Sequence, residues 1–494
     1  MLYKIKNTLQ QTFIYSLSNI ALKASGLILL PLYLRTFSVA QFGVWDLLDT
    51  SIQILAEILI LGQASAIIFL NNSEEYKNQK SSALFSVFIF LTLFISILIS
   101  AVEIINYSFP NLFNGELINF DYLRISSFII LLRVISNLFF SKIRADEEAK
   151  YYTALNILRI VLIISLTIFF VSIKKYGIYG ALLSFLISEI LIFLILLVKM
   201  IPQMKLKFNS ELLRVALIFG LPLVLSSAGF MILNLSDRYI IKWLIGAKYV
   251  AIYGLGYRIA GVLNMFLILP FNLSLLPLAY KYFGKENDKR FYSKLMTYST
   301  FFFVWGFVVL SLFSPEIIFL FAGKGNYESS FFVIPIILLS YVFSGMRLTA
   351  QLGMLLTKNT KHIAWITIAA AVLNIVLNLV FIPSFGIIAA AVNTLVSFLL
   401  FYIVTQIVSN IYYKIPFENF KLVLMILLGL LLSLPVYFFS QIKIEFILLK
   451  LLLVLLFPFV LFIFKFYEKA ELEILTSKEK IVAFTKDLFS INIK

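Results

Sequence analysis

The chain has 494 residues, of which 61% are hydrophobic and only 13% are charged, and its mean hydropathy is +0.99. Soluble domains carry about 25% charged residues, so this composition excludes a soluble fold and predicts a polytopic membrane protein. The chain has no cysteine, which excludes disulfides, thiolate metal sites and cysteine nucleophiles. The net charge of +16 does not indicate nucleic-acid binding, because the basic residues are sorted along the chain by loop.

The apolar runs are long enough to cross a bilayer as α-helices of about 20 residues, and too long for the strands of a membrane β-barrel. They predict an all-α protein with about fourteen transmembrane helices. The first run reads as a retained span and not as a cleaved signal peptide, because it contains Asn19 and Lys23 and lacks a small-residue cleavage site. The expected helices are 9–34, 43–69, 82–105, 122–143, 152–173, 178–199, 212–236, 250–273, 291–314, 331–356, 361–382, 387–409, 420–440 and 444–466.

Lysine and arginine concentrate in alternate loops. If the N-terminus is cytoplasmic, the inside segments contain far more of both residues than the outside segments. The positive-inside rule then places both termini in the cytoplasm, which agrees with an even number of helices.

Two sequence echoes indicate an internal duplication. Tyr176–Ala181 is echoed by Phe385–Ala390, 209 positions later, and Ala40–Trp45 resembles Ala247–Tyr253 at nearly the same offset. Each repeat would contain six helices, so the two repeats are parallel and enclose a central cavity, as in many transporters. The predicted divisions are an N-terminal lobe at 1–205, a C-terminal lobe at 206–412, a helix pair at 413–466, and a cytoplasmic tail at 467–494.

Ionisable side chains within the first two helices are expected to face the cavity, because a charge in lipid costs about 2.5–3.5 kcal/mol. Asn19 and Lys23 fall on one face of the first helix at a spacing of four residues. Asp46, Asp49 and Glu57 form a stripe on the second helix. These carboxylates are predicted to avoid lipid and are candidates for carrying a proton.

Further cations occur in the fourth, eighth and tenth predicted helices. Arg258 shares a helix face with Gly254 and Gly261, which leave room beside its guanidinium, and is the strongest single candidate for substrate binding. Arg133 and Arg347 have the same potential role. Guanidinium binds phosphate oxygens in a bidentate manner, and low dielectric strengthens the attraction. Together with Lys23, these arginines predict a cationic cavity suited to a diphosphate.

A structural interpretation of the same charges remains open, in which they pair internally and hold helices together. Lys23 would then bind Asp49, and Arg159 would bind Glu189. Arg238 is expected only as part of a basic rim at the periplasmic end of the seventh helix.

The segment from Asn374 to Ala391 reads NIVLNLVFIPSFGIIAAA. It resembles the N-x3-N-x4-P-x2-G-I-x-[GA]-A signature of bacterial polysaccharide transporters, the O-antigen-type flippases of lipid-linked oligosaccharides. Segments Ser236–Ile241 and Ala251–Ala260 resemble that family too. The resemblance implies a multi-pass protein of the bacterial inner membrane that moves polyprenyl-diphosphate oligosaccharides by alternating access, for O-antigen, capsule or exopolysaccharide synthesis.

The wider superfamily also contains multidrug and toxin extruders and the lipid II flippase. Similarity to the latter implies that cations on the first and eighth helices contact the diphosphate, and Lys23 and Arg258 occupy those helices. A third cation, on the second helix of that relative, is replaced here by Asp46, Asp49 and Glu57, which counts against lipid II as substrate. The last two helices correspond to a groove for the polyprenyl tail.

The same similarity implies a cation site between the seventh, eleventh and twelfth helices. By position, its candidates are Asp237, Asn374, Asn378 and Thr394. Asn374 and Asn378 lie one helical turn apart, so their oxygens can reach one hard ion. The alternative is an interhelical hydrogen-bond clamp. Two explanations for the direction of transport remain open. One is coupling to Na⁺ or H⁺, and the other is removal of the product in the periplasm.

A cation-coupled multidrug exporter is the competing transport function, favoured by the carboxylates of the second helix. An enzyme of the same pathway, such as a polymerase, would need a large periplasmic loop, and the single histidine, His362, borders a short cytoplasmic one. We therefore expect no enzymatic activity, no cofactor and no nucleic-acid partner. The expected partners are the lipid-linked oligosaccharide, membrane lipids, and other proteins of polysaccharide assembly.

Overall fold

The computed structural model describes residues 18, 20–22, 24–76, 79–110, 119–323, 327–437, 444–464 and 466. Two predicted site residues, Asn19 and Lys23, and the predicted tail at 467–494 lie outside these residues. Within them, residues 24–36 continue the first predicted span as a helix.

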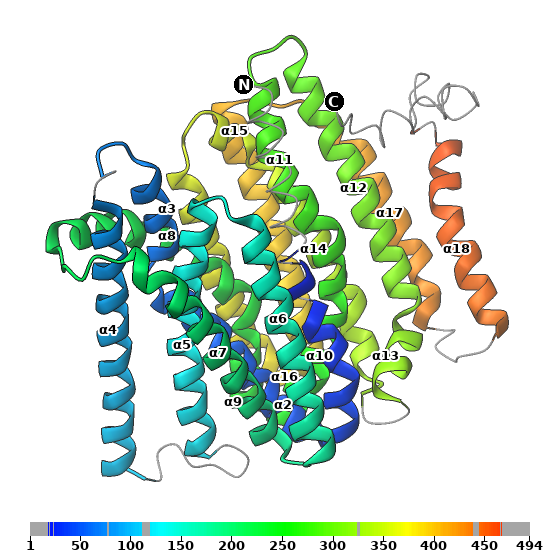
Figure 1. The fold of residues 1–494 in the computed structure, drawn as a ribbon. Helices are drawn as coiled ribbons and strands as arrows, with labels where there is room; N and C mark the ends of the chain where they lie inside the picture. The colour runs from blue at the N-terminus through cyan, green and yellow to red at the C-terminus, as the bar shows by residue number, and fades with distance from the viewer. Residues whose placement is uncertain are drawn as a thin grey trace.

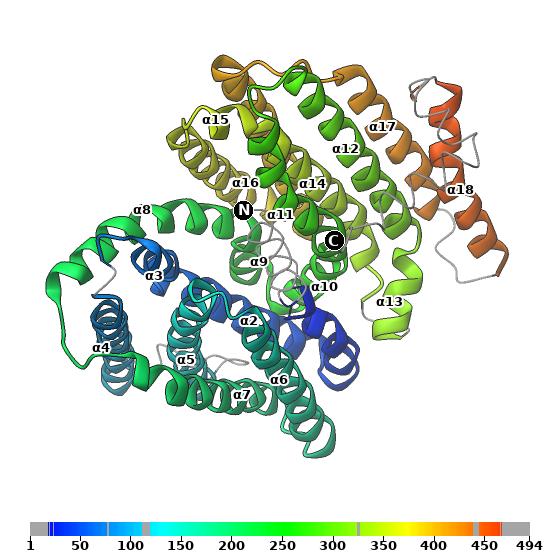
Figure 2. The same cartoon turned by 45° about the horizontal axis from the view of Figure 1, so that its top comes forward.

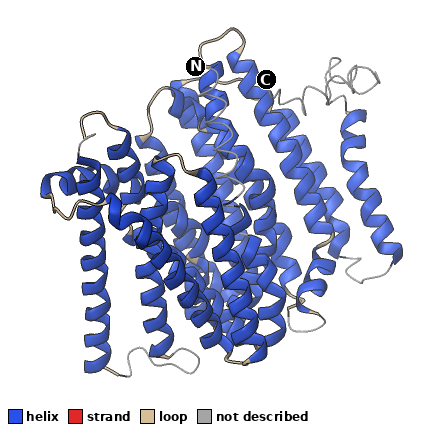
Figure 3. Ribbon diagram, in the orientation of Figure 1, coloured by secondary structure: helices blue, strands red, loops and turns tan. Residues whose placement is uncertain are grey.

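The described chain folds into helices joined by short loops, without strands (Figure 3). This confirms the predicted all-α class. The α-helices after the first span are α2 (Val39–Leu59), α3 (Gln63–Asn72), α4 (Lys80–Ser108), α5 (Phe120–Ala145), α6 (Ala149–Thr167), α7 (Gly177–Met200), α8 (Ser210–Leu235), α9 (Asp237–Ile245), α10 (Ala247–Leu263), α11 (Leu269–Tyr282), α12 (Asp288–Leu312), α13 (Ser314–Ala322), α14 (Ser330–Ala350), α15 (Leu352–Leu356), α16 (Lys361–Tyr412), α17 (Asn419–Ser433) and α18 (Ile444–Ile463).

Among the described residues, 12 helical stretches are long and apolar enough to cross a membrane. One of them, α16, spans 52 residues and is two helices joined at a kink, where Gly386 has φ 63° and ψ −145°. Only glycine adopts such a conformation readily, and Pro383 removes a backbone donor just before it. Both residues belong to the signature segment. With α16 divided and the first span added, the helices match the predicted order.

The helices form two groups (Figure 2). The helices from α2 to α7 lie on one side, those from α9 to α17 lie on the other, and α8 runs between the groups. The groups meet where α2 packs along α10. These helices begin with the echoed segments Ala40–Trp45 and Ala247–Tyr253, so the segments that the sequence predicts to be equivalent pack against each other.

The close approach of α2 and α10 depends on Gly43. A Cβ added at Gly43 would lie 2.0 Å from the carbonyl oxygen of Ala247, which is backbone and cannot rotate away. We therefore expect Gly43→Ala to force the two lobes apart and lower the melting temperature of the purified protein. Gly229→Ala is the matched control, since its Cβ would make ordinary contacts of 3.5 Å or more. Equal melting temperatures for the two variants would contradict this packing.

The two ends of the bundle differ in charge. One end, drawn at the top of Figure 1, contains the loop between α11 and α12 and the short helix α15; we call it the basic end. Lys281, Lys285, Lys289 and Arg290 lie in or beside that loop. The C-terminal end of α4 and the loop that follows α6 lie at the opposite end.

Candidate functional site

A cavity of about 690 Å³ lies between the two groups of helices. We call it the central cavity. Its wall comes from the first helix, α2, α5, α6, α7 and α10, from Leu235 at the end of α8 and Arg238 on α9, and from Tyr341 on α14. It also includes Asn264 and Met265, which belong to a π-helical stretch (Asn264–Ile268) between α10 and α11. Single π-helical turns are rare and occur often at functional sites.

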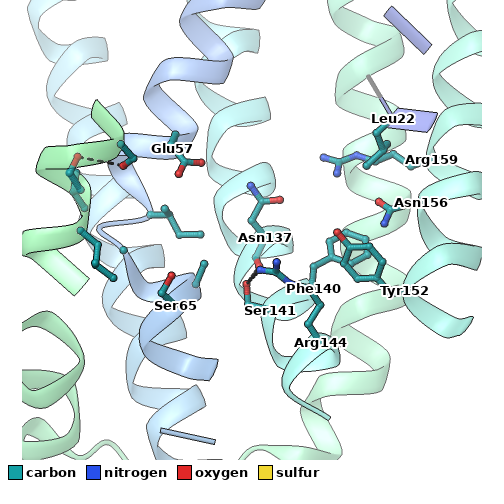
Figure 4. Close-up of a pocket in the computed structure, with 16 residues that line it drawn as sticks. Leu22, Glu57, Ser65, Asn137, Phe140, Ser141, Arg144, Tyr152, Asn156 and Arg159 are labelled. Carbon is teal, nitrogen blue, oxygen red and sulfur yellow. Dashed lines mark hydrogen bonds between the residues drawn. The ribbon is translucent and has the colours of Figure 1, made fainter. Parts of the chain in front are cut away.

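A second cavity, of about 380 Å³, adjoins the first; we call it the vestibule. The two cavities share Leu22, Glu57, Asn137 and Arg159 as lining residues. The vestibule reaches Arg144, at the last turn of α5, and Tyr152, in the first turn of α6, next to the connecting loop 146–148 (Figure 4). The vestibule therefore extends from the central cavity toward the basic end.

Asp46 of α2 stands at the centre of a buried ion cluster that joins the lobes. Arg238 Nε donates to its Oδ2 at 2.8 Å, and Arg258 Nε donates to its Oδ1 at 2.7 Å. Arg258 Nη2 also donates to Asp49 Oδ2 at 2.7 Å. The Tyr257 ring lies against the Arg238 guanidinium, 4.6 Å from centroid to Cζ. Two carboxylates of one lobe thus bind two guanidiniums of the other.

The position of Arg238 corrects the prediction that it belongs to an exposed basic rim. Only 4% of its side chain is exposed, against 1% for Asp46. Ser236 separates α8 from α9, and Arg238, in the first turn of α9, binds Asp46 of α2. A buried, paired arginine within a membrane bundle is a structural element of the lobe interface.

Arg258 remains partly open to the central cavity, with 20% of its side chain exposed. A Cβ added at Gly254 would lie 2.5 Å from Asp46 Oδ2, so this glycine admits the Asp46 carboxylate. On the other side, a Cβ at Gly26 would lie 3.9 Å from Arg258 Nη1. The room that the sequence predicts beside Arg258 is therefore taken in part by Asp46, whereas Nη1 faces the first helix and has no hydrogen-bond partner among the described residues.

A second ion cluster lies within the N-terminal lobe. Glu189 of α7 is fully buried and accepts from Arg133 Nε at 3.0 Å and from Arg159 Nη2. The interpretation that Arg159 pairs with Glu189 is confirmed. Arg133, which was expected as a free cation, joins the same carboxylate. Both arginines line the central cavity, and the cluster has one more positive charge than negative.

Charges of both signs therefore line the central cavity, from the arginines and from the carboxylates of α2. Glu57 also lines it and has no cationic partner among the described residues. Arg347 is not among the lining residues. Its Nη1 donates to Gln351 at 2.8 Å, and its guanidinium lies over the Phe401 ring at 4.5 Å. The sequence places these cations on the correct helices, but their partners come from tertiary packing.

The four residues expected to bind a cation lie together in the C-terminal lobe, all fully buried. Asp237 Oδ1 accepts from Asn378 at 2.7 Å, and its Oδ2 accepts from Thr394 at 2.8 Å and from Tyr253. Asn378 also donates to Asn374 Oδ1 at 3.1 Å. We call Asp237, Asn374, Asn378 and Thr394 the oxygen cluster.

Two residues that the sequence reasoning missed belong beside the oxygen cluster. Tyr253 binds Asp237, and Asn393 donates to Asn378 Oδ1 at 3.0 Å. An asparagine within an otherwise apolar helix was a usable signal for Asn393. Asn374 Nδ2 has no partner among the described residues, although it is buried. Most buried polar atoms are satisfied, so this orphaned donor marks a site where the hydrogen bonding is incomplete.

The fold is shared with transporters of known structure. The lipid II flippase MurJ in its inward closed conformation matches with a TM-score of 0.75 at 18% identity, over 92% of this chain and 100% of that chain. An inward-facing multidrug resistance MATE family transporter of the MOP superfamily matches with a TM-score of 0.64 at 17% identity, over 84% of this chain and 95% of that one. Its outward-facing counterpart gives 0.57 at 18% identity, over 84% and 96%.

Sequence families agree with the structural likeness. The MatE family model matches residues 222–380. No curated protein matches the chain. The family model described as polysaccharide biosynthesis protein matches residues 8–283, which is more than half of the chain. The predicted resemblance is thereby confirmed, and the chain belongs to the polysaccharide biosynthesis protein family.

Proposed function

We propose that this protein is a flippase that moves polyprenyl-diphosphate-linked oligosaccharides from the cytoplasmic to the periplasmic leaflet of the bacterial inner membrane, without a chemical step. One observation carries the proposal: arginines from both lobes, Arg133 and Arg159 from one and Arg258 from the other, line a single cavity within the membrane-spanning bundle. Family membership and the likeness to MurJ support it.

The arginines of the cavity bind carboxylates, but these ion pairs leave some of their N–H donors available. A guanidinium has five N–H donors. Arg133 donates to Glu189 through Nε, and Arg159 donates to the same carboxylate through Nη2. The remaining donors of both have no side-chain acceptor among the described residues. They suit the oxygens of a diphosphate, which guanidinium binds in a bidentate manner.

The ion cluster around Asp46 suits a gate between the lobes. It closes the seam where α2 meets α10, while the vestibule extends toward the basic end. Under the positive-inside rule the basic end is cytoplasmic, and this conformation then receives substrate from the cytoplasm. Opening to the other side requires Arg238 and Arg258 to leave Asp46. Oxygens of a bound diphosphate replace the carboxylates in that exchange.

The oxygen cluster fits a monovalent coupling cation. Its members offer carboxylate, amide and hydroxyl oxygens, which are ligands for hard cations. Asp237 precedes Arg238 directly in the chain, so a change at the cluster reaches the gate through one peptide bond. We propose Na⁺ or H⁺ as the coupling ion. For protons, Asp46, Asp49 and Glu57 are further candidate carriers.

Sodium binding is tested by thermal stability. A ligand at 100 times its Kd stabilises the folded state by about 2.7 kcal/mol. We expect the melting temperature of the purified protein to rise with Na⁺ when choline maintains the ionic strength, and Asp237→Asn to remove this rise. Asp288→Asn, at the start of α12, is the matched control and should keep it. An equal rise in the Asp237→Asn variant would contradict sodium binding at the oxygen cluster.

A cation-coupled multidrug exporter is the second candidate. The observation that favours it is Glu57, a carboxylate in the cavity without a described cationic partner. A deletion strain separates the two functions. Accumulation of polyprenyl-diphosphate oligosaccharide with loss of surface glycan supports the flippase and identifies its sugar. Normal glycolipid with increased sensitivity to cationic dyes would establish the exporter instead.

A further inference from the structure

The vestibule combines two guanidiniums with amides, a carboxylate and two aromatic rings. We infer that it is a sugar subsite, which holds the uncharged sugar residues nearest the diphosphate while the diphosphate lies in the central cavity. The inference rests on the proposed flippase function. It assigns the specificity for glycan to the vestibule, and in particular to Asn156 and Glu57.

Both hydrogen-bond donors and acceptors face the vestibule (Figure 4). Arg144 and Arg159 supply donors, Glu57 supplies an acceptor, and the amides of Asn137 and Asn156 supply both. A sugar hydroxyl both donates and accepts, so it uses such a mixture fully. A phosphate at neutral pH mainly accepts, so it leaves acceptor oxygens such as that of the Asn156 amide without a donor. The lining therefore favours an uncharged polyol or acetamido sugar over a second anion.

Asn156 provides the most specific sign of a ligand. Its side chain is 2% exposed and lines the vestibule, and its Nδ2 has no acceptor among the described residues. Leaving a buried donor unsatisfied costs about 1–3 kcal/mol. A sugar hydroxyl or carbonyl oxygen that accepts from Nδ2 recovers this free energy when the substrate binds.

Aromatic rings complete the wall. Tyr152 and Phe140 both line the vestibule, and their rings pack edge to face with centroids 5.2 Å apart. An aromatic wall with a few convergent polar groups is typical of small-molecule sites, and a volume of about 380 Å³ falls in their usual range of roughly 300–1,000 Å³. Because Glu57, Asn137 and Arg159 also line the central cavity, one ligand can occupy both spaces.

The test compares two lipids on the full-length protein in detergent. One is undecaprenyl diphosphate, and the other is the lipid-linked glycan purified from cells that lack this protein. For the wild type we expect the glycosylated lipid to bind at least about tenfold more tightly, which corresponds to about 1.4 kcal/mol. Asn156→Ala should remove most of this difference and leave the Kd of undecaprenyl diphosphate unchanged, because Asn156 lines the vestibule alone. Glu57→Gln should lower the ratio of the two Kd values, because the variant loses a carboxylate that accepts from the sugar.

The controls separate the subsite from the fold and from the proposed function. Asn72→Ala, at the exposed end of α3, should behave as wild type. Glu57→Gln is a near-isosteric change at an exposed cavity position and keeps the test valid if Asn156→Ala misfolds. Equal affinity of the wild type for the two lipids, or equal weakening of both lipids by the variants, would overturn the subsite and leave the flippase standing. Failure of the wild type to bind either lipid would overturn both proposals.

Discussion

Replacing Asp46 by alanine should lower the stability of the purified protein by about 3–5 kcal/mol, the usual cost of removing one partner from a buried ion pair. The side chains of Arg238 and Arg258 are 4% and 20% exposed and both bind this carboxylate. Without it, Arg238 has no carboxylate among its described contacts. Differential scanning fluorimetry of the detergent-solubilised protein measures the effect.

An exposed ion pair gives the matched control for Asp46→Ala. Asp121 lies 3.6 Å from Arg124, and its side chain is 63% exposed. Exposed pairs contribute about 0–1 kcal/mol, so Asp121→Ala should leave the melting temperature nearly unchanged. If the two alanine variants have the same melting temperature, the cluster around Asp46 does not hold the lobes in contact.

Arg258→Lys should reduce export at least about tenfold although it preserves the positive charge. The guanidinium binds Asp46 and Asp49 at the same time through Nε and Nη2, at 2.7 Å each. A lysine ammonium is a point charge and lacks the planar fork of N–H donors that a guanidinium presents. Charge-assisted hydrogen bonds contribute about 1.5–3 kcal/mol each, which sets the expected size of the loss. Arg258→Ala and the double change Lys23→Ala/Arg258→Ala should abolish export.

Surface polysaccharide and the amount of protein in the membrane are measured in the same cells, so that loss of transport is separated from loss of protein. Arg124→Lys is the control, since Arg124 binds Glu103 in an exposed pair. Normal export by the Arg258→Lys variant would show that the fork is dispensable. Normal export by the double variant would refute the role of cations in substrate binding.

Hydropathy and repeats predicted the fold because both can be recognised in the sequence without knowledge of tertiary contacts. Runs of about 20 apolar residues define spans without any knowledge of packing. The motif around Pro383 and Gly386 marked the kink in α16, where the backbone requires a glycine. The echoed segments near Gly43 and Ala247 indicated two repeats, and these positions meet at the lobe interface.

The ion-pair partners of the charged residues could not be predicted from the sequence, for a physical reason. Arg238 pairs with Asp46, 192 positions away, because the two groups of helices meet where α2 packs along α10. Helical periodicity predicts which face a residue occupies but not which neighbour that face meets. The same limit made Arg133 look unpaired, whereas Glu189, on a helix that packs against α5, binds it.

The oxygen cluster was found by resemblance and not by periodicity. Asn374 and Asn378 share a helix face, but nothing in their spacing relates them to Asp237 or Thr394. The kink at Gly386 allows the two halves of α16 to present Asn378 and Thr394 to the same carboxylate. Only the folded chain reveals that Asn393 and Tyr253 complete the group.

Translocation by the purified protein in liposomes tests the proposed function most directly. Lipid-linked glycan from the deletion strain is incorporated in both leaflets, and the glycan in the outer leaflet is then removed by a hydrolase that cannot cross the membrane. With wild-type protein, nearly all of the glycan should become accessible, whereas about half should stay protected in empty liposomes and in those with Arg258→Ala. If half stays protected with wild-type protein too, while a cationic dye is transported, the protein is a multidrug exporter and not a flippase.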